Sequence, residues 1–203
     1  MLVDASVARS FGVIGWTRYL LQVGGGTIFV ADGVHGQRPG DPSELRNIRI
    51  ALQRQADLAN PGSGLASRAL AAMHGLDQLF SLAPNELTVL TLSKDDLDIA
   101  VRLQSRRPED REWRRSLDAR SRRLDAGESA SIAIALSRSQ AFASDDEDAL
   151  TLWKAITGSP GQRTRDLLRH LVTCRAIDED EAWAGPDRTP HRRRKTSYPE
   201  PKS

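Results

Sequence analysis

The chain of 203 residues has the length of one domain with a short appendage. Its 39% hydrophobic and 28% charged residues are typical of a globular protein with a core, which excludes a fibrous or wholly disordered chain. No apolar run approaches the roughly 18–20 residues of a membrane-spanning helix, and Asp4 interrupts the start that an export signal needs. We therefore expect a cytoplasmic protein without membrane contact. The single cysteine, Cys174, excludes an intrachain disulfide.

Charge is unevenly distributed along the chain. The net charge is +2, but six basic and two acidic residues from Pro186 onward leave a net charge of −2 for residues 1–185. The final segment has four prolines and few apolar side chains, so it buries too little surface to offset the entropy of ordering. We predict one folded domain over residues 1–185 and a disordered basic tail over residues 186–203. A nucleic-acid tether and a solubilising tail are both open roles for it.

Hydrophobic periodicity and turn residues predict alternating strands and helices in the first part of the chain. The expected elements are a strand at residues 2–4, a helix from Ser6 to about Gln22, a strand at residues 27–31, a turn at residues 33–40, and helices at residues 45–58 and 66–82. The second strand is short, β-branched and bounded by glycines.

The same alternation continues in the second part. We expect a strand at residues 87–92, a helix that Ser93–Asp96 begins, a charged stretch at residues 104–124, a helix at residues 127–139, a strand at residues 140–144, and a helix that contains Leu167, Leu168, Leu171 and Val172. Strands that alternate with helices favour an α/β fold with a mostly parallel sheet.

Acidic side chains occur where parallel-sheet enzymes place their chemistry, at strand ends or helix starts. Asp4 ends the first strand, Glu128 opens an alanine-rich helix, and Asp145 and Asp146 end the last strand. Converging carboxylates repel one another, and hard divalent cations prefer oxygen ligands, so these acids suggest a Mg²⁺ or Mn²⁺ site. For each acid alone, a turn or helix-capping role is the alternative.

Three short motifs carry a resemblance to PIN domains, in particular to a subgroup akin to VapC-type toxins. Residues 2–7 (Leu-Val-Asp-Ala-Ser-Val) resemble the opening strand, metal-binding Asp and small-residue turn of the family. Residues 124–133 resemble its Gly-Glu and Ala-Ile-Ala helix, and residues 142–149 resemble its strand-end pair of aspartates. The resemblance covers roughly residues 1–175 and implies a PIN-like three-layer sandwich with a mostly parallel central sheet.

The resemblance implies a ribonuclease that uses Mg²⁺ or Mn²⁺ to activate water against a phosphodiester of RNA. Asp4, Glu128 and Asp146 would be the catalytic acids and metal ligands, and Asp145 would be a ligand or the neighbour of one. A toxin of a toxin–antitoxin pair is one form that such an enzyme takes, and an antitoxin protein would then be its partner. Assembly of the chain into a homodimer is a further expectation.

One position departs from the family pattern. After the second strand the family has a Val followed three residues later by a Glu, whereas this chain has Val34 and then Gln37. Gln37 can offer a metal its carbonyl oxygen but no charge, and Glu44 on the next helix is the alternative fourth acid. Gln37 therefore favours a second hypothesis, a catalytically weakened PIN-fold module that binds nucleic acid or regulates. A third is an α/β interaction protein whose acids are unconnected.

The stretch from Gln104 to Leu124 resembles a lengthened connection and is rich in arginine. Its eight arginines are Arg106, Arg107, Arg111, Arg114, Arg115, Arg120, Arg122 and Arg123. They could form a track for phosphate groups with Trp113 as a stacking neighbour. The alternative is a solvated helix in which Glu109, Asp110 and Glu112 pair with neighbouring arginines.

Overall fold

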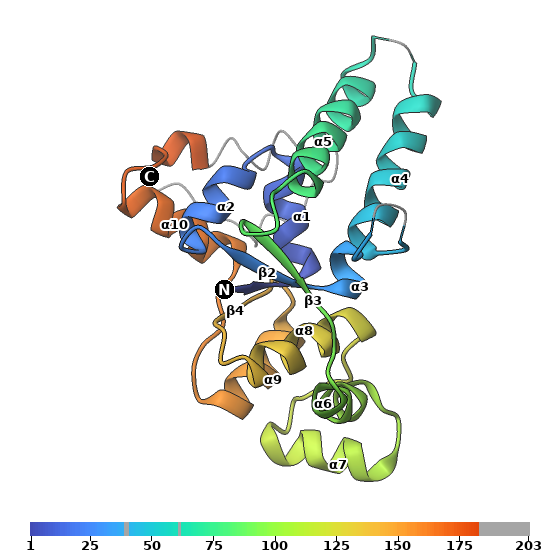
Figure 1. The fold of residues 1–203 in the computed structure, drawn as a ribbon, viewed down its shortest axis with the longest axis vertical. Helices are drawn as coiled ribbons and strands as arrows, with labels where there is room; N and C mark the ends of the chain where they lie inside the picture. Colours follow the sequence, from blue (N-terminus) through green and yellow to red (C-terminus); the bar gives the residue numbers. More distant parts are fainter. Residues whose placement is uncertain (39–40, 61, 183–203) are drawn as a thin grey trace.

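A sheet of four parallel strands forms the centre of the fold in a computed structural model that describes residues 1–38, 41–60 and 62–182 (Figure 1). The strands are β1 (Leu2–Val3), β2 (Ile28–Ala31), β3 (Leu87–Leu90) and β4 (Phe142–Ala143), in the spatial order β3-β2-β1-β4. Every neighbouring pair is parallel, so each strand must be joined to the next by a crossover. The predicted α/β class and parallel sheet are confirmed.

Helices cover both faces of the sheet and give three layers (Figure 1). One face carries α1 (Ala5–Val13), α2 (Thr17–Val23), α4 (Glu44–Leu58), α5 (Gly64–Phe80) and α10 (Thr164–Thr173). The other carries α6 (Lys94–Gln104), α7 (Pro108–Leu117), α8 (Ala126–Ser137) and α9 (Glu147–Thr157). The short α3 (Asp32–His35) follows β2 directly. This arrangement fits the predicted three-layer sandwich.

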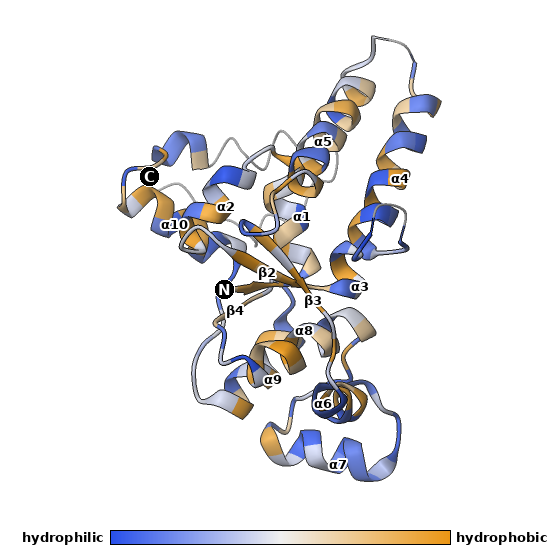
Figure 2. Ribbon diagram, in the orientation of Figure 1, coloured by the Kyte–Doolittle hydropathy of each residue, from blue (hydrophilic) through white to orange (hydrophobic). Residues whose placement is uncertain are grey.

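The core lies between the sheet and its two helical layers. Leu2, Val3, Ile28 and Phe142 on the strands have almost no exposed surface, because helices pack on both faces of a parallel sheet. Figure 2 shows the strands as hydrophobic, whereas α7, the helix furthest from the sheet, is mostly hydrophilic. No helix in the described ranges is long and apolar enough to cross a membrane.

The helix predicted from Ser6 to Gln22 is two helices, because the chain turns at Gly15. The backbone of Gly15 has φ +74°, a left-handed conformation that ends a helix and favours glycine. The N–H of Trp16 donates to the Phe11 carbonyl at 2.9 Å, which closes the end of α1. The change of direction lets α2 pack against α10.

Other elements also differ from prediction. The expected turn at residues 33–40 begins with α3, the charged stretch contains α7, and α9 was not predicted. Pro108 in the first turn of α7 and Asp146 at the N-cap of α9 are ordinary helix-start signals. The last strand is shorter than residues 140–144. The predicted tail at residues 186–203 and the domain end at residue 185 lie outside the described residues.

Backbone contact between α1 and α5 fixes where α1 lies. A Cβ atom added to Gly75 of α5 would lie 2.0 Å from the carbonyl oxygen of Gly12 and 2.9 Å from the amide nitrogen of Gly15. Such distances leave no room for any side chain at residue 75. The crossing holds α1 close to α5, and α1 begins directly after Asp4.

Gly75→Ala should therefore destabilise the protein by about 2–3 kcal/mol, because the new methyl group forces the two backbones apart. Gly64→Ala is the matched control, since it lies on the same helix and a Cβ there meets nothing within 4 Å. Urea denaturation of both variants measures the difference. Equal stability of the two variants would contradict the close crossing.

Candidate functional site

The carboxylate of Asp4 lies where β1 ends and α1 begins, and the residue is only 3% exposed. Its Oδ2 accepts hydrogen bonds from the hydroxyls of Ser144 at 3.0 Å and Ser6 at 3.2 Å. Its Oδ1 accepts a long one, 3.5 Å, from Ser131. Burial raises the pKa of Asp4, and the hydrogen bonds from Ser144 and Ser6 oppose that rise.

Glu128 lies in the first turn of α8 and forms a reciprocal capping box with Asp125. The Glu128 N–H donates to Asp125 Oδ1 at 2.8 Å, and the Asp125 N–H donates to Glu128 Oε2 at 3.1 Å. Burial raises the pKa of Glu128 to about 7, and the negative charges of Asp125, Asp146 and Asp4 add to the shift. Glu128 thus lies within electrostatic reach of three other acids.

Glu44, the first residue of α4, belongs to the same group of acids. Glu44 Oε2 and Asp125 Oδ1 both lie close to Gly127. A Cβ atom added to this glycine would be 3.2 Å from the Glu44 oxygen and 3.5 Å from the Asp125 oxygen. Although the residue as a whole is exposed, desolvation of its carboxyl group raises the pKa of Glu44, and the charges of Asp4 and Asp125 raise it further. Arg9 opposes the rise. The structure therefore brings the alternative fourth acid to the site.

Gln37, the other candidate for the fourth position, is exposed just beyond the end of α3. Within the part of the chain that the structure describes, its side chain forms no hydrogen bond with Asp4, Glu44 or Glu128. The chain turns between α3 and α4, so Gln37 has the sequence spacing that the family pattern predicts, whereas Glu44 is the residue that lies near the other acids. The spacing from Val34 alone could not reveal this difference, because it carries no information about the turn.

The two aspartates after β4 have different surroundings. Asp146 is the N-cap of α9, where its Oδ1 accepts the Ala149 N–H at 2.9 Å. Asp145 accepts the N–H and the hydroxyl of Thr164 at 2.9 and 2.8 Å, and the hydroxyl of Ser10 at 3.3 Å. These bonds connect Asp145 to α1 and α10, which favours its interpretation as the neighbour of a ligand.

Five carboxylates thus gather at the carboxyl ends of β1 and β4 and the starts of α4 and α8. This acid cluster consists of Asp4, Glu44, Asp125, Glu128 and Asp146. Sequence reasoning did not select Asp125 as a site residue, although an Asp three residues before a Glu is a capping-box signal. As the side chains stand, no group of three or more His, Cys, Asp or Glu among the described residues is arranged to hold a metal ion.

Comparison with known proteins finds no relative of this chain. No protein-family model, no curated protein and no solved structure matches the chain. The acid cluster and the three sequence motifs are therefore the features of the chain that bear on its function.

Glu128 should make the metal-free protein less stable as the pH rises. Its pKa is about 7 in the folded state against an ordinary value of 4.5, so the folded state binds the proton more tightly. The stabilisation is complete below about pH 4.5 and is lost as the pH rises through about 7. Glu128→Gln cannot ionise but can still cap α8, so its stability should fall less over this range.

Thermal melts in EDTA between pH 4.5 and 8 measure this difference. Glu112→Gln is the control, because Glu112 is an exposed glutamate on α7. A Glu128→Gln variant that follows the pH dependence of the wild type would show that Glu128 titrates normally.

Proposed function

We propose that the protein is a ribonuclease with a PIN-like fold whose acid cluster binds Mg²⁺ or Mn²⁺. The observation that carries this proposal is the gathering of five carboxylates at one edge of a parallel sheet, where burial, with a further contribution from the neighbouring negative charges, raises the pKa of Glu128 to about 7. The three PIN-like motifs in the sequence contribute Asp4, Glu128 and Asp146 to this edge.

The donor atoms of the cluster suit a hard divalent cation. All of them are carboxylate oxygens, and their mutual repulsion is the energy that a cation would relieve. Asp4 Oδ1 accepts the long 3.5 Å bond from Ser131, and the Asp4 carboxylate also accepts a backbone hydrogen bond from Ala5. Within the described residues, Glu128 Oε1 and Asp146 Oδ2 accept no hydrogen bond, so each of these two acids keeps one oxygen for a ligand.

The chain's own residues position these oxygens. Ser6 and Ser144 hold Asp4 by its other oxygen, and the capping box holds Glu128 at the start of α8. A divalent cation, when bound, lowers the pKa of water and neutralises charge on the scissile phosphate. Because metal-free Glu128 holds a proton below about pH 7, this side chain must release it to act as a ligand. Affinity for the cation should therefore rise with pH.

A PIN-fold module that binds RNA without cutting it is the second candidate function. The observation that favours it is that Glu128 and Asp146 already accept backbone N–H groups, from Asp125 and Ala149. An antitoxin partner and a homodimer stay predictions from the sequence resemblance.

Asp4→Asn should abolish both RNA cleavage and stabilisation by Mn²⁺. Mn²⁺ at a hundred times its Kd should stabilise the wild type by about 2.7 kcal/mol, because it binds only the folded state. Glu44→Gln should weaken this effect, since Glu44 supplies the fourth carboxylate, whereas Gln37→Ala should leave it unchanged. Thermal melts across a Mn²⁺ titration and an RNA-cleavage assay with Mn²⁺ or EDTA measure the two properties.

The outcomes separate the candidates. Cleavage that persists in EDTA would refute the metal mechanism, and identical Mn²⁺ responses of wild type and Asp4→Asn would show that Asp4 is no ligand. Mn²⁺ stabilisation with RNA binding but without cleavage would instead establish the binding module. A loss of Mn²⁺ response in Gln37→Ala, and not in Glu44→Gln, would return Gln37 to the fourth position.

A further inference from the structure

A cavity of about 380 Å³ is lined by residues of α7 and of the segments on either side of it. Figure 1 shows α7 at the opposite end of the molecule from α4 and α5. The cavity has the size of an ordinary ligand site. Six arginines line it and define what we call the arginine pocket: Arg106, Arg111, Arg114, Arg115, Arg122 and Arg123. None of the acid cluster lines this cavity, so it is a separate feature of the molecule.

Three arginine side chains on α7 form one wall of the pocket. Arg111, Arg114 and Arg115 are three and four residues apart, which places them on one face of the helix. Arg114 is only 4% exposed, and its guanidinium donates to the carbonyls of Arg102 and, at 2.8 Å, Ser105. Burial is the main cause that lowers the pKa of Arg114, and the positive charge of Arg111 contributes to it.

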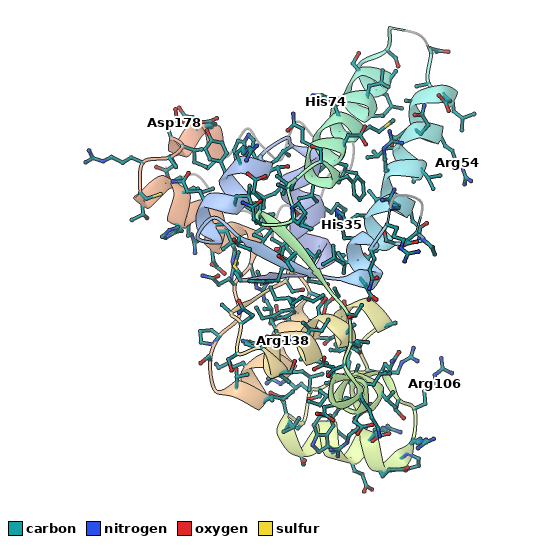
Figure 3. All side chains as sticks on the ribbon, in the orientation of Figure 1. His35, Arg54, His74, Arg106, Arg138 and Asp178 are labelled. Atoms are coloured by element: carbon teal, nitrogen blue, oxygen red, sulfur yellow. The ribbon has the colours of Figure 1, made fainter. Side chains whose placement is uncertain are left out.

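Two connecting segments supply the other walls. Arg106 comes from the turn between α6 and α7, and Figure 3 shows it at that corner of the molecule. Arg122 and Arg123 come from the segment that returns from α7 to α8. The Ser121 hydroxyl fixes that segment by donating to the Arg114 carbonyl at 2.9 Å. Arginines distant along the chain therefore converge on one space.

The chain's own acids form no ion pairs with the described pocket arginines, although the negative charge of Asp110 acts on Arg114 and opposes the lowering of its pKa. Asp110, the buried acid of α7, pairs at 3.5 Å with Arg102, whose guanidinium also covers one face of the Trp113 ring at 4.1 Å. Among the described residues, no carboxylate forms an ion pair with any of the six pocket arginines. The alternative in which Glu109, Asp110 and Glu112 pair with neighbouring arginines is therefore found only for Asp110, with Arg102, and the pocket arginines are open to an anion from outside.

We propose that the arginine pocket binds phosphate groups of a single-stranded RNA. The planar guanidinium donates two parallel hydrogen bonds to phosphate oxygens, so several converging guanidiniums are suited to that group. One wall of the pocket lies next to the acid cluster in the chain, since Arg123 precedes Asp125 by two residues and their Cα atoms are at most about 7 Å apart. One strand can therefore contact both. The choice of RNA as the ligand rests on the proposed function.

The test compares two double variants of the full chain that lose the same charge. Arg111→Ala/Arg115→Ala removes two exposed pocket arginines without touching the buried Arg114. The control, Arg54→Ala/Arg68→Ala, removes two exposed arginines on α4 and α5, and Figure 3 shows Arg54 far from Arg106. Binding of a fluorescent single-stranded RNA is measured in EDTA, so that cleavage plays no part, and thermal melts check that each variant folds.

The pocket variant should bind RNA about tenfold more weakly than the wild type, because it loses two charge-assisted contacts. The slope of log affinity against log salt concentration should be shallower by about 1.4, because binding releases fewer counterions when two phosphate contacts are lost. The control should retain the wild-type affinity and slope. Arg122→Ala/Arg123→Ala, on the return segment, should repeat the loss and replaces the first variant if that one does not fold.

Equal RNA affinity in the pocket and control variants would overturn the proposal, even if the wild type cleaves RNA. The reduced affinity without any Mn²⁺-dependent cleavage would support the pocket and refute the ribonuclease. Titration with inorganic pyrophosphate distinguishes the other source of phosphate. If the pocket variant loses pyrophosphate binding but keeps RNA binding, the pocket holds free phosphate compounds and the RNA assignment is wrong.

Discussion

A carboxylate in the interior of a protein must be surrounded by hydrogen-bond donors, because an unpaired buried charge costs several kcal/mol or more. Asp4 imposes this requirement at the carboxyl end of β1, where the residue is only 3% exposed. Its donors are the hydroxyls of Ser6, Ser144 and Ser131, which come from α1, from the end of β4 and from α8. One side chain thus fixes the relative positions of elements from three parts of the chain.

The serine hydroxyls transmit this constraint to the other acids. Ser6 donates to Asp4 and accepts the N–H of Asp145 at 2.9 Å, and Ser144 donates to Asp4 and accepts the N–H of Asp146 at 3.1 Å. The backbone after β4 is therefore held by the same hydroxyls that satisfy the buried carboxylate. This hydrogen-bond chain and the parallel sheet together hold Asp4 and Asp146 in place, whereas Asp125 and Glu128 are held by the capping box at the start of α8.

Much of the sheet could be predicted from the sequence, because β2 is a short β-branched run bounded by glycines and the other strands are short apolar runs between helical segments. The same logic placed Asp4, Glu128 and Asp146 near one another, since the carboxyl ends of parallel strands share an edge. The choice between Glu44 and Gln37 could not be made, because it depends on the path of the connection between α3 and α4, and loop paths have no periodic signal.

Two local features could not be predicted from the sequence, the end of α1 at Gly15 and the convergence of the arginines, and the physical reasons differ. Apolar spacing continues through Gly15, so periodicity alone predicts one helix, whereas the left-handed backbone there ends α1. Whether the arginines at residues 104–124 pair with acids or face a ligand could not be decided from the sequence, because Glu109 and Glu112 are close enough along the chain to pair with them. Only the three-dimensional structure shows that the arginines face a common cavity instead.

The arginine-bearing segment leaves and rejoins the rest of the molecule at neighbouring points. The N–H of Leu124 donates to the carbonyl of Leu103 at 3.2 Å, so the chain returns to the place it left after a long excursion through α7. Between these ends the segment packs against α6 and α9, away from the strands. Because its ends already meet, the excursion can lengthen, shorten or be exchanged during evolution without a change in the direction of the flanking helices. The arginine-bearing segment is then a portable module, free to diversify while the residues at the sheet edge stay the same.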